Sequence, residues 1–283
     1  MLVRILVGAG CGLCALGLAF LTDTPVLPAV MAVLSFLCEF ELTRCAGTLR
    51  RPALSVPSLL IAAAAPAAAG FVPADAFLGY ALPVSGAYLV FAAAVYTVCA
   101  GRAEKDSPSI SLEQAAVTGF FTLYTAIGFS SVVLICRTEN GFLVFPLIFI
   151  AAWGTDVFAF FSGYFFGKHK LIPAVSPKKT VEGAIGGTLI CTLIFVVYSL
   201  IAGVISGGSV EIDIILLAIL GVLSSAVAQI GDLIMSAVKR SYGIKDFGKV
   251  LPGHGGFLDR FDSVLSVSTV FYLFITVFNM FKG

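Results

Sequence analysis

The sequence has few charged side chains for its length. Asp, Glu, Lys and Arg together make up 12% of the 283 residues, whereas hydrophobic residues make up 59%. A soluble globular domain is about a quarter charged, because its surface faces water. This shortage excludes a soluble protein of the same size. Apolar stretches of about twenty residues recur along the chain, and each is long enough to cross a bilayer as a helix.

The sequence also lacks the usual patterns of metal–thiolate and P-loop chemistry. It has two histidines and seven cysteines, and the cysteines lie in or beside apolar stretches, where we interpret them as small packing residues. Cys11 and Cys14 form a C-x-x-C pattern, but no His, Asp or Glu stands beside them, so no metal or redox site is indicated there. No G-x-x-x-x-G-K-[ST] run occurs.

A series of apolar spans accounts for most of the chain. The first span follows Arg4 and imitates a signal peptide, but it has no clear small-residue cleavage site, so we expect a spanning helix. The sequence therefore predicts an all-α polytopic membrane protein with about nine transmembrane helices. They are expected at residues 5–22, 25–42, 53–72, 77–100, 112–136, 141–166, 183–205, 214–235 and 263–281.

Basic residues are distributed unevenly between the two sides that these spans define. If the N-terminus is cytoplasmic, 15 of the 17 lysines and arginines fall on the cytoplasmic side. Only Arg137 and Lys282 fall on the other side. Cytoplasmic loops of membrane proteins carry such an excess, so the bias supports both the orientation and the number of spans.

Two cytoplasmic connections, 167–182 and 236–262, are the longest polar stretches and contain both histidines. We expect any catalytic chemistry to lie there. The chain is accordingly divided into N-terminal transmembrane helices, 1–110, and a transmembrane catalytic region, 111–283. No soluble domain and no internal repeat is recognised in the sequence.

Carboxylates stand where spans meet the second connection. Asp232, Ser236 and Lys239 are spaced i, i+4, i+7 and so share one helix face. Asp259 and Asp262 share a face at the start of the last span. The topology allows the three aspartates to converge at the cytoplasmic boundary. Clustered carboxylates without cysteine or paired histidines suit a hard cation such as Mg²⁺, which often shares its ligands with substrate phosphates.

Basic residues and glycines accompany these carboxylates. The cations would neutralise phosphate charge, and the glycines beside His254 would let backbone N–H groups approach a nucleotide. His254 itself is interpreted as a loop-ordering or phosphate-contacting residue. A metal with cations is what phosphoryl or nucleotidyl transfer needs, although a solvated positive-inside face is the ordinary alternative. The basic residues are Lys239, Arg240, Lys245, Lys249 and Arg260.

Asp156 is a candidate of a different kind, because it lies inside the sixth span, roughly three turns from the polar end of that span. A carboxylate within the membrane is a functional candidate by default. The alternative is a structural hydrogen bond to Ser162 or to another helix.

The connection 167–182 contains Ser176-Pro177 followed by Lys178 and Lys179. We interpret Ser176-Pro177 as a helix cap and first turn whose N–H groups would hold an anion. The two lysines strengthen a phosphate interpretation. A positive-inside anchor is the alternative, and a nucleic-acid site is not expected in a membrane-buried chain.

The run from Ser236 to Asp262 resembles the signature of the phosphatidate cytidylyltransferase (CDP-diacylglycerol synthase) family. The run Ser176–Gly183 and the surroundings of Asp156 also resemble the family, whereas the first hundred residues match only in being apolar helices. Within the signature, the matching residues are Ser236, Lys239-Arg240, Lys245-Asp246, His254-Gly255-Gly256, Asp259-Arg260 and Asp262.

The resemblance implies a reaction in which an oxygen of the phosphatidate headgroup attacks the α-phosphorus of CTP. CDP-diacylglycerol forms, pyrophosphate leaves and a divalent ion is required. The resemblance also implies a homodimeric helical protein of the bacterial inner (plasma) membrane, with its polar site open to the cytoplasm and to membrane lipids.

The resemblance also assigns roles residue by residue. Asp232, Asp259 and Asp262 become ligands of magnesium, with an optional second cation, and join Lys239 as the catalytic residues. The remaining residues would bind phosphates, nucleotide or headgroup: Ser176, Lys178, Lys179, Thr180, Glu182, Ser236, Arg240, Lys245, His254 and Arg260.

Two other functions remain open at this point. Another CTP-using lipid enzyme, such as a polyprenol kinase-like protein or a synthase of a different CDP-lipid, would share the metal and nucleotide logic. An ion-coupled transporter is motivated by Asp156 and Asp232 within the membrane. Transporters often have inverted repeats and broken helices at the midplane. We find neither in the sequence, and these carboxylates lie toward one face.

Overall fold

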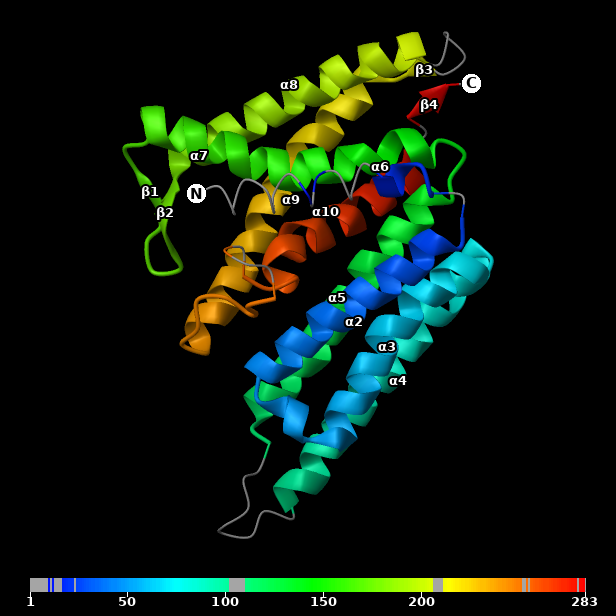
Figure 1. The fold of residues 1–283 in the computed structure, drawn as a ribbon, viewed down its shortest axis with the longest axis vertical. Coiled ribbons are helices and arrows are strands. Elements are labelled where there is room, and N and C mark those ends of the chain that lie inside the picture. The colour runs from blue at the N-terminus through cyan, green and yellow to red at the C-terminus, as the bar shows by residue number, and fades with distance from the viewer. Residues whose placement is uncertain are drawn as a thin grey trace. The chain divides into compact units, whose positions relative to one another are not determined.

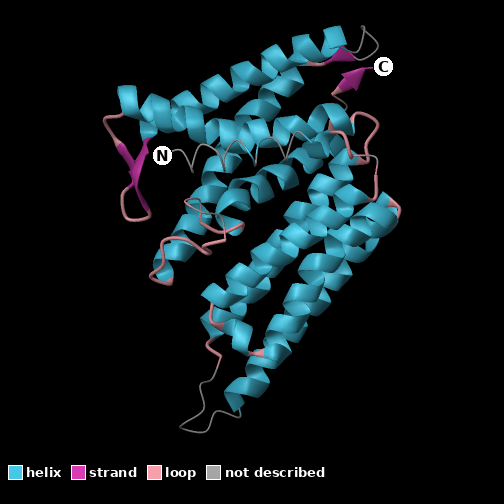
Figure 2. Ribbon diagram, in the orientation of Figure 1, coloured by secondary structure: helices cyan, strands magenta, loops and turns pink. Residues whose placement is uncertain are grey.

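The fold is known from a computed structural model, and its elements are labelled as in Figure 1. Long helices dominate it (Figure 2). In the part of the chain that is described, eight helical segments are long and apolar enough to cross a membrane, which confirms an all-α polytopic membrane protein. The first expected span, 5–22, lies mostly outside that part. The described residues are 10, 12, 17–22, 24–101, 110–205, 211–250, 253, 255–278 and 280–282.

The chain forms two compact units, and both are discontinuous in sequence. The first contains Thr24–Leu134 and Asp246–Asp259. The second contains Gly8–Asp23, Ile135–Lys245 and Arg260–Gly283. The sequence-based division at residue 110 concerns where catalysis resides, and it stays a prediction.

The first unit is a set of antiparallel helices that match four expected spans (Figure 1). Pro52 opens the second of them, a position where its missing N–H costs nothing. The elements are α2 (Val26–Cys45), a 3₁₀ turn η1 (Thr48–Arg50), α3 (Pro52–Phe71), α4 (Ala74–Gly101) and α5 (Leu112–Cys136).

A buried polar network joins the helices of the first unit. Glu39 of α2 is fully buried and accepts hydrogen bonds from Thr122 Oγ1 at 2.7 Å and Thr125 Oγ1 at 3.3 Å. Tyr88 of α4 donates to Thr122 at 2.9 Å, and its hydroxyl lies 2.7 Å from Ser58 Oγ of α3. Lipid provides no hydrophobic drive between helices, so such bonds help to hold the helices together.

The second unit carries the remaining helices. The expected span 141–166 is one membrane-length segment interrupted by a π-helical turn, and α9 continues past its expected end to Ser241. Asp213 caps α9, accepting from the N–H groups of Ile215 and Leu216. The helices are α6 (Gly141–Phe149), the π turn η2 (Ile150–Gly154), α7 (Thr155–Phe166), α8 (Val181–Ile205), α9 (Ile214–Ser241) and α10 (Leu258–Val277), which starts in the first unit.

Two short strand pairs were not expected from the sequence. Strands β1 (Lys170–Ile172) and β2 (Ser176–Thr180) form an antiparallel hairpin in which Lys170 pairs with Thr180 (Figure 2). Strand β3 (Glu211–Ile212) pairs with β4 (Phe281–Lys282), so the last span ends at Val277, earlier than predicted.

The hairpin shows that the helix cap predicted at Ser176-Pro177 is wrong. Both residues lie in β2, and α8 begins at Val181. The cap is Thr180, whose Oγ1 accepts the N–H of Gly183 at 3.1 Å. Proline is tolerated in an edge strand as well as at a helix start, so the Ser-Pro pair did not distinguish the two.

Small residues let α7 and α8 approach closely. A Cβ on Gly183 would lie 2.6 Å from the carbonyl oxygen of Ala159, and one on Gly187 would lie 2.9 Å from the Cβ of Ala159. Gly183 and Gly187, four residues apart on α8, therefore serve packing. The close contact fixes the start of α8, and with it the hairpin, against the helix that carries Asp156.

Candidate active site

A polar cavity of about 600 Å³ lies in the second unit, where α7, α8, α9 and the β1–β2 hairpin meet. It collects most of the residues predicted from the 167–182 connection, together with Asp156 and Asp232. The polar side chains that line it are Asp156, Tyr164, Lys168, Lys170, Ser176, Lys178, Lys179, Thr180, Gln229 and Asp232.

Lys179 is the cation that two of these carboxylates share. Its Nζ lies 2.6 Å from Asp232 Oδ2 and 3.8 Å from Asp156 Oδ1. The side chains of Lys179 and Asp232 are 21% and 23% exposed, so the closer pair is partly shielded from water. The π turn η2 directly precedes α7 and therefore Asp156, and such turns are frequent at functional sites.

Asp262 and Lys239 extend this group of charges into the interior of the second unit. They are 5% and 8% exposed. Asp262 lies close enough to Asp232, Asp156 and Lys239 for their charges to interact, and its Oδ1 accepts the N–H of Ser263 at 2.7 Å. The structure thus brings together three carboxylates from three different helices.

Arg260 contributes a third cation. Its charge acts on Asp156, and its backbone carbonyl accepts the indole N–H of Trp153 at 3.0 Å. Three carboxylates and three cations therefore gather in this part of the second unit. Such an arrangement has donors for a cation and positive groups for an anion within one site.

A row of polar groups that the sequence did not reveal supports the cavity. Thr155 Oγ1 donates to Ser225 Oγ at 2.9 Å, and Ser225 donates to Thr188 Oγ1 at 3.2 Å. Gln229 Nε2 donates to Thr188 Oγ1 at 3.1 Å. These bonds join α7, α8 and α9 next to the carboxylates. Ser225 and Gln229 are four residues apart on α9, but no sequence spacing relates them to Thr155 of α7 or Thr188 of α8.

The donor chemistry fits magnesium better than a softer metal. Within the described residues, no group of three or more His, Cys, Asp or Glu side chains is arranged to hold a metal ion. Magnesium is usually held by one or two carboxylates, with water and substrate phosphates completing its shell. Asp232 and Asp262 offer two such carboxylates from facing helices, and neither thiol nor imidazole lines the described cavity.

Asp259, the third predicted ligand, belongs to the first unit and is 7% exposed. Its Oδ2 accepts the N–H of Phe247 at 2.8 Å and that of Gly256 at 2.9 Å. The N–H of Gly256 is thus used within the loop and is not turned toward a nucleotide. The role of Asp259 as a ligand stays a prediction.

Two other predicted residues hold the backbone of the second unit. Glu182 accepts from the N–H groups of Lys168 at 3.0 Å and His169 at 3.1 Å, and its Oε1 lies 2.6 Å from His169 Nδ1. Arg240 donates to the carbonyl oxygens of Val175 and Ile244.

For three further predicted residues, the structure gives only the exposure or nothing at all. Ser236 on α9 is half-buried, and Lys245 is exposed. His254 lies outside the described residues.

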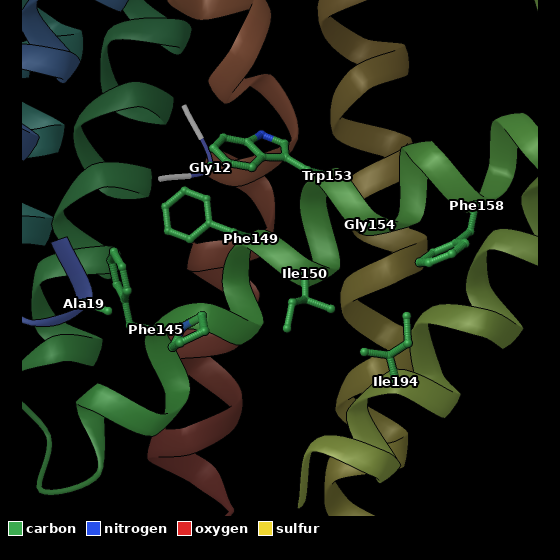
Figure 3. Close-up of a pocket in the computed structure, with 10 residues that line it drawn as sticks. Gly12, Ala19, Phe145, Phe149, Ile150, Trp153, Gly154, Phe158 and Ile194 are labelled. Atoms are coloured by element: carbon green, nitrogen blue, oxygen red, sulfur yellow. The ribbon is translucent and has the colours of Figure 1, made fainter. Parts of the chain in front are cut away.

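A second cavity in this unit, of about 390 Å³, is lined almost entirely by apolar groups. Phe145, Phe149 and Trp153 follow one another along α6 and η2 and turn their rings toward it (Figure 3). Neighbouring ring centroids are 5.1 and 4.8 Å apart. None of its described lining residues has a side chain that would take part in phosphate chemistry.

The fold and the cavity define a class, namely polytopic membrane proteins with a carboxylate and lysine site suited to phosphate groups and a divalent cation. Within that class, the chain belongs to the cytidylyltransferase family, whose sequence pattern matches residues 2–278.

Curated relatives include phosphatidate cytidylyltransferases of several bacteria. That of Bacillus subtilis is 42% identical over 130 residues, which cover 46% of each chain. That of Staphylococcus haemolyticus is 40% identical over 157 residues, 56% of this chain and 57% of the relative. That of Brucella abortus is 34% identical over 199 residues, 68% of this chain and 65% of the relative. The matches span between 46% and 65% of the length of these relatives.

Proposed function

We propose that this chain is a phosphatidate cytidylyltransferase that transfers CMP from CTP to phosphatidate and releases pyrophosphate. The observation that carries the proposal is the polar cavity in which Lys179 lies between Asp232 and Asp156. The family membership and the names of the relatives supply the reaction. The site has acceptors for a cation and cations for phosphate, which nucleotidyl transfer requires.

The lysines at the mouth of the cavity would bind the triphosphate. Lys168, Lys170 and Lys178 are exposed residues of the hairpin region that line it. Lys179 and Lys239, which are more enclosed, would stabilise the charge that develops on the phosphates. The headgroup oxygen of phosphatidate is already largely ionised near neutral pH, so the attack needs no strong base.

Asp232 and Asp262 would hold Mg²⁺, with Asp259 as a predicted further ligand. When bound, the ion neutralises phosphate charge and orients the leaving group. We further propose a homodimer in the bacterial inner membrane, with the cavity facing the cytoplasm. The proposal also includes an optional second metal cation beside the magnesium. A lipid phosphate at the interface and a nucleotide from the cytoplasm would then meet at one boundary.

Purified protein in mixed micelles, incubated with CTP labelled at the α- or the γ-phosphorus, tests the reaction. We expect α-label in the lipid only with phosphatidate present, no γ-label, and loss of product on adding EDTA with recovery in excess Mg²⁺. Transfer of γ-label to a polyprenol would instead identify a kinase. Substrate uptake by sealed liposomes without CTP would identify a transporter.

A further inference from the structure

The loop that carries the middle of the signature is held by α2, far away in sequence. This loop, residues 246–258, belongs to the first unit with α2. Arg44 Nη2 donates to the carbonyl oxygen of Phe247 at 2.7 Å. Glu41 Oε2 accepts the N–H of Leu258 at 2.9 Å. The two contacts therefore hold opposite ends of the loop.

Asp259 completes the closure of the 246–258 loop. Its carboxylate accepts from both Phe247 and Gly256, so the N–H and the carbonyl of Phe247 are both bound by side chains. Phe247 itself is 3% exposed. Three side chains thus fix four backbone groups where the two ends of the loop meet.

Glu41 explains why glycine occupies position 256. Glu41 is 3% exposed. A Cβ on Gly256 would overlap its carboxylate group, and the three nearest atoms all belong to Glu41. A Cβ on Gly248 would meet the same carboxylate. Any side chain at position 256 would therefore displace Glu41 and release the N–H of Leu258.

We propose that Glu41 and Arg44 are positioning residues, which fix the 246–258 loop in the conformation that cytidylyl transfer uses. The inference rests on the proposed function. Neither side chain is placed at the reacting atoms; both act through the loop backbone and Asp259. Misplacement of catalytic groups by about 1 Å costs on the order of 100-fold in rate, so loosening the loop lowers turnover without removing a reacting group.

Hydrogen–deuterium exchange of the full chain in micelles tests the contacts without reference to catalysis. We expect Glu41→Ala and Arg44→Ala to accelerate exchange in peptides covering Phe247, Gly256 and Leu258. Glu39→Gln is the matched control, because Glu39 is a buried carboxylate of the same helix that binds Thr122 and Thr125. Exchange in the loop that stays at the wild-type rate in both alanine variants overturns the inference.

Kinetics test the link to the reaction. We expect Glu41→Ala to lower kcat by about 10- to 100-fold with little change in the KM for CTP. Glu41→Gln, which keeps an acceptor for Leu258, should recover most of the rate. Gly256→Ala should resemble Glu41→Ala, and the double variant should be little worse than either, because both break one contact.

The positioning role and the proposed cytidylyltransferase activity on which it rests can be contradicted by different outcomes. If the losses in kcat of Glu41→Ala and Gly256→Ala multiply in the double variant, the two residues do not act through one contact. If Glu41→Gln is as slow as Glu41→Ala, the hydrogen bond to Leu258 does not position the loop. A wild-type chain that makes no CDP-lipid overturns the proposed reaction and this catalytic role, while the exchange rates still report whether α2 holds the loop.

Discussion

Asp262 is the most enclosed carboxylate of the candidate active site. It is 5% exposed and near two other aspartates, with Lys239 as a nearby cation. An ionisable group enclosed in this way inside a membrane protein is costly and is a functional candidate by default. Replacing Asp262 with a neutral residue should therefore lower activity without lowering stability.

We expect Asp262→Asn to lower turnover by at least about 100-fold, while the apparent Tm without magnesium stays the same or rises. The neutral amide cannot ionise, so it removes the cost of placing a charge in this buried position next to Asp232 and Asp156. Lipid-product assays and thermal unfolding in micelles measure the two effects. Asp213→Asn at the start of α9 is the control, because asparagine still caps a helix there. Normal turnover in Asp262→Asn would remove this residue from the site.

At the scale of single residues, the sequence predicted those site residues that a local rule marks and missed those that only the fold brings together. The rule that a carboxylate within a span is functional singled out Asp156. Glu39 and Glu41 in the span 25–42 satisfy the same rule, but no motif surrounds them that would have marked either residue. The approach of Lys179 to Asp232 follows from no spacing, because the two residues lie on different elements that only the fold brings together.

At the scale of helices and strands, the polar cavity depends most on the packing of α7 against α8. Asp156 lies on α7, and the hairpin residues precede α8 directly. Any change that separates the two helices therefore moves both walls of the cavity.

We expect Gly187→Ala to destabilise the protein and Gly203→Ala not to. A methyl at position 187 would press on the backbone of α7 and cost about 1–3 kcal/mol. A Cβ at position 203 would meet no atom of its described surroundings within 4 Å, so alanine should be neutral or stabilise by roughly 0.5–1 kcal/mol. Thermal unfolding in micelles measures both, and equal Tm values would show that α7 and α8 do not meet at Gly187.

Glu182 should control the order of the hairpin. Glu182→Ala removes the acceptor of two backbone N–H groups, so we expect much faster trypsin cleavage at Lys168 and Lys170. His169→Ala removes only the imidazole contact and should change cleavage far less. Digestion in micelles followed by mass spectrometry measures the rates. Equal cleavage of all three proteins would mean that other contacts order the hairpin.

Helix positions could be predicted because hydropathy is a property of each segment alone, and the spans from 25–42 to 214–235 appear near their expected positions. Element ends that depend on partners could not. The hairpin needs β1 to pair with β2, and the last helix ends at Val277 as β4 pairs with β3.

For the whole molecule, the orientation across the membrane remains a prediction that rests on charge. We expect Lys178→Cys to react with a membrane-impermeant maleimide only after cells are opened, because the hairpin is predicted to be cytoplasmic. Glu139→Cys should react in intact cells. Both positions are exposed, and the parent protein gives the background from native cysteines. The reverse labelling pattern would invert the orientation and place the cavity outside.

No sequence pattern indicated that residues 246–259 fold with the N-terminal helices. The signature was recognised as a local run, and α2 as an ordinary apolar helix. The connection between them includes the hydrogen bonds from Arg44 to Phe247 and from Leu258 to Glu41, which only the folded chain reveals.

That connection has a consequence for biosynthesis. Glu41 is made 217 residues before Leu258, and at about 5–20 residues per second the ribosome needs roughly 10–40 s to supply this partner. Throughout that interval the newly inserted α2 carries a carboxylate whose binding site does not yet exist. A chain that stops before the 246–258 loop keeps Glu41 and Arg44 in that unfinished state, so incomplete chains differ physically from finished ones.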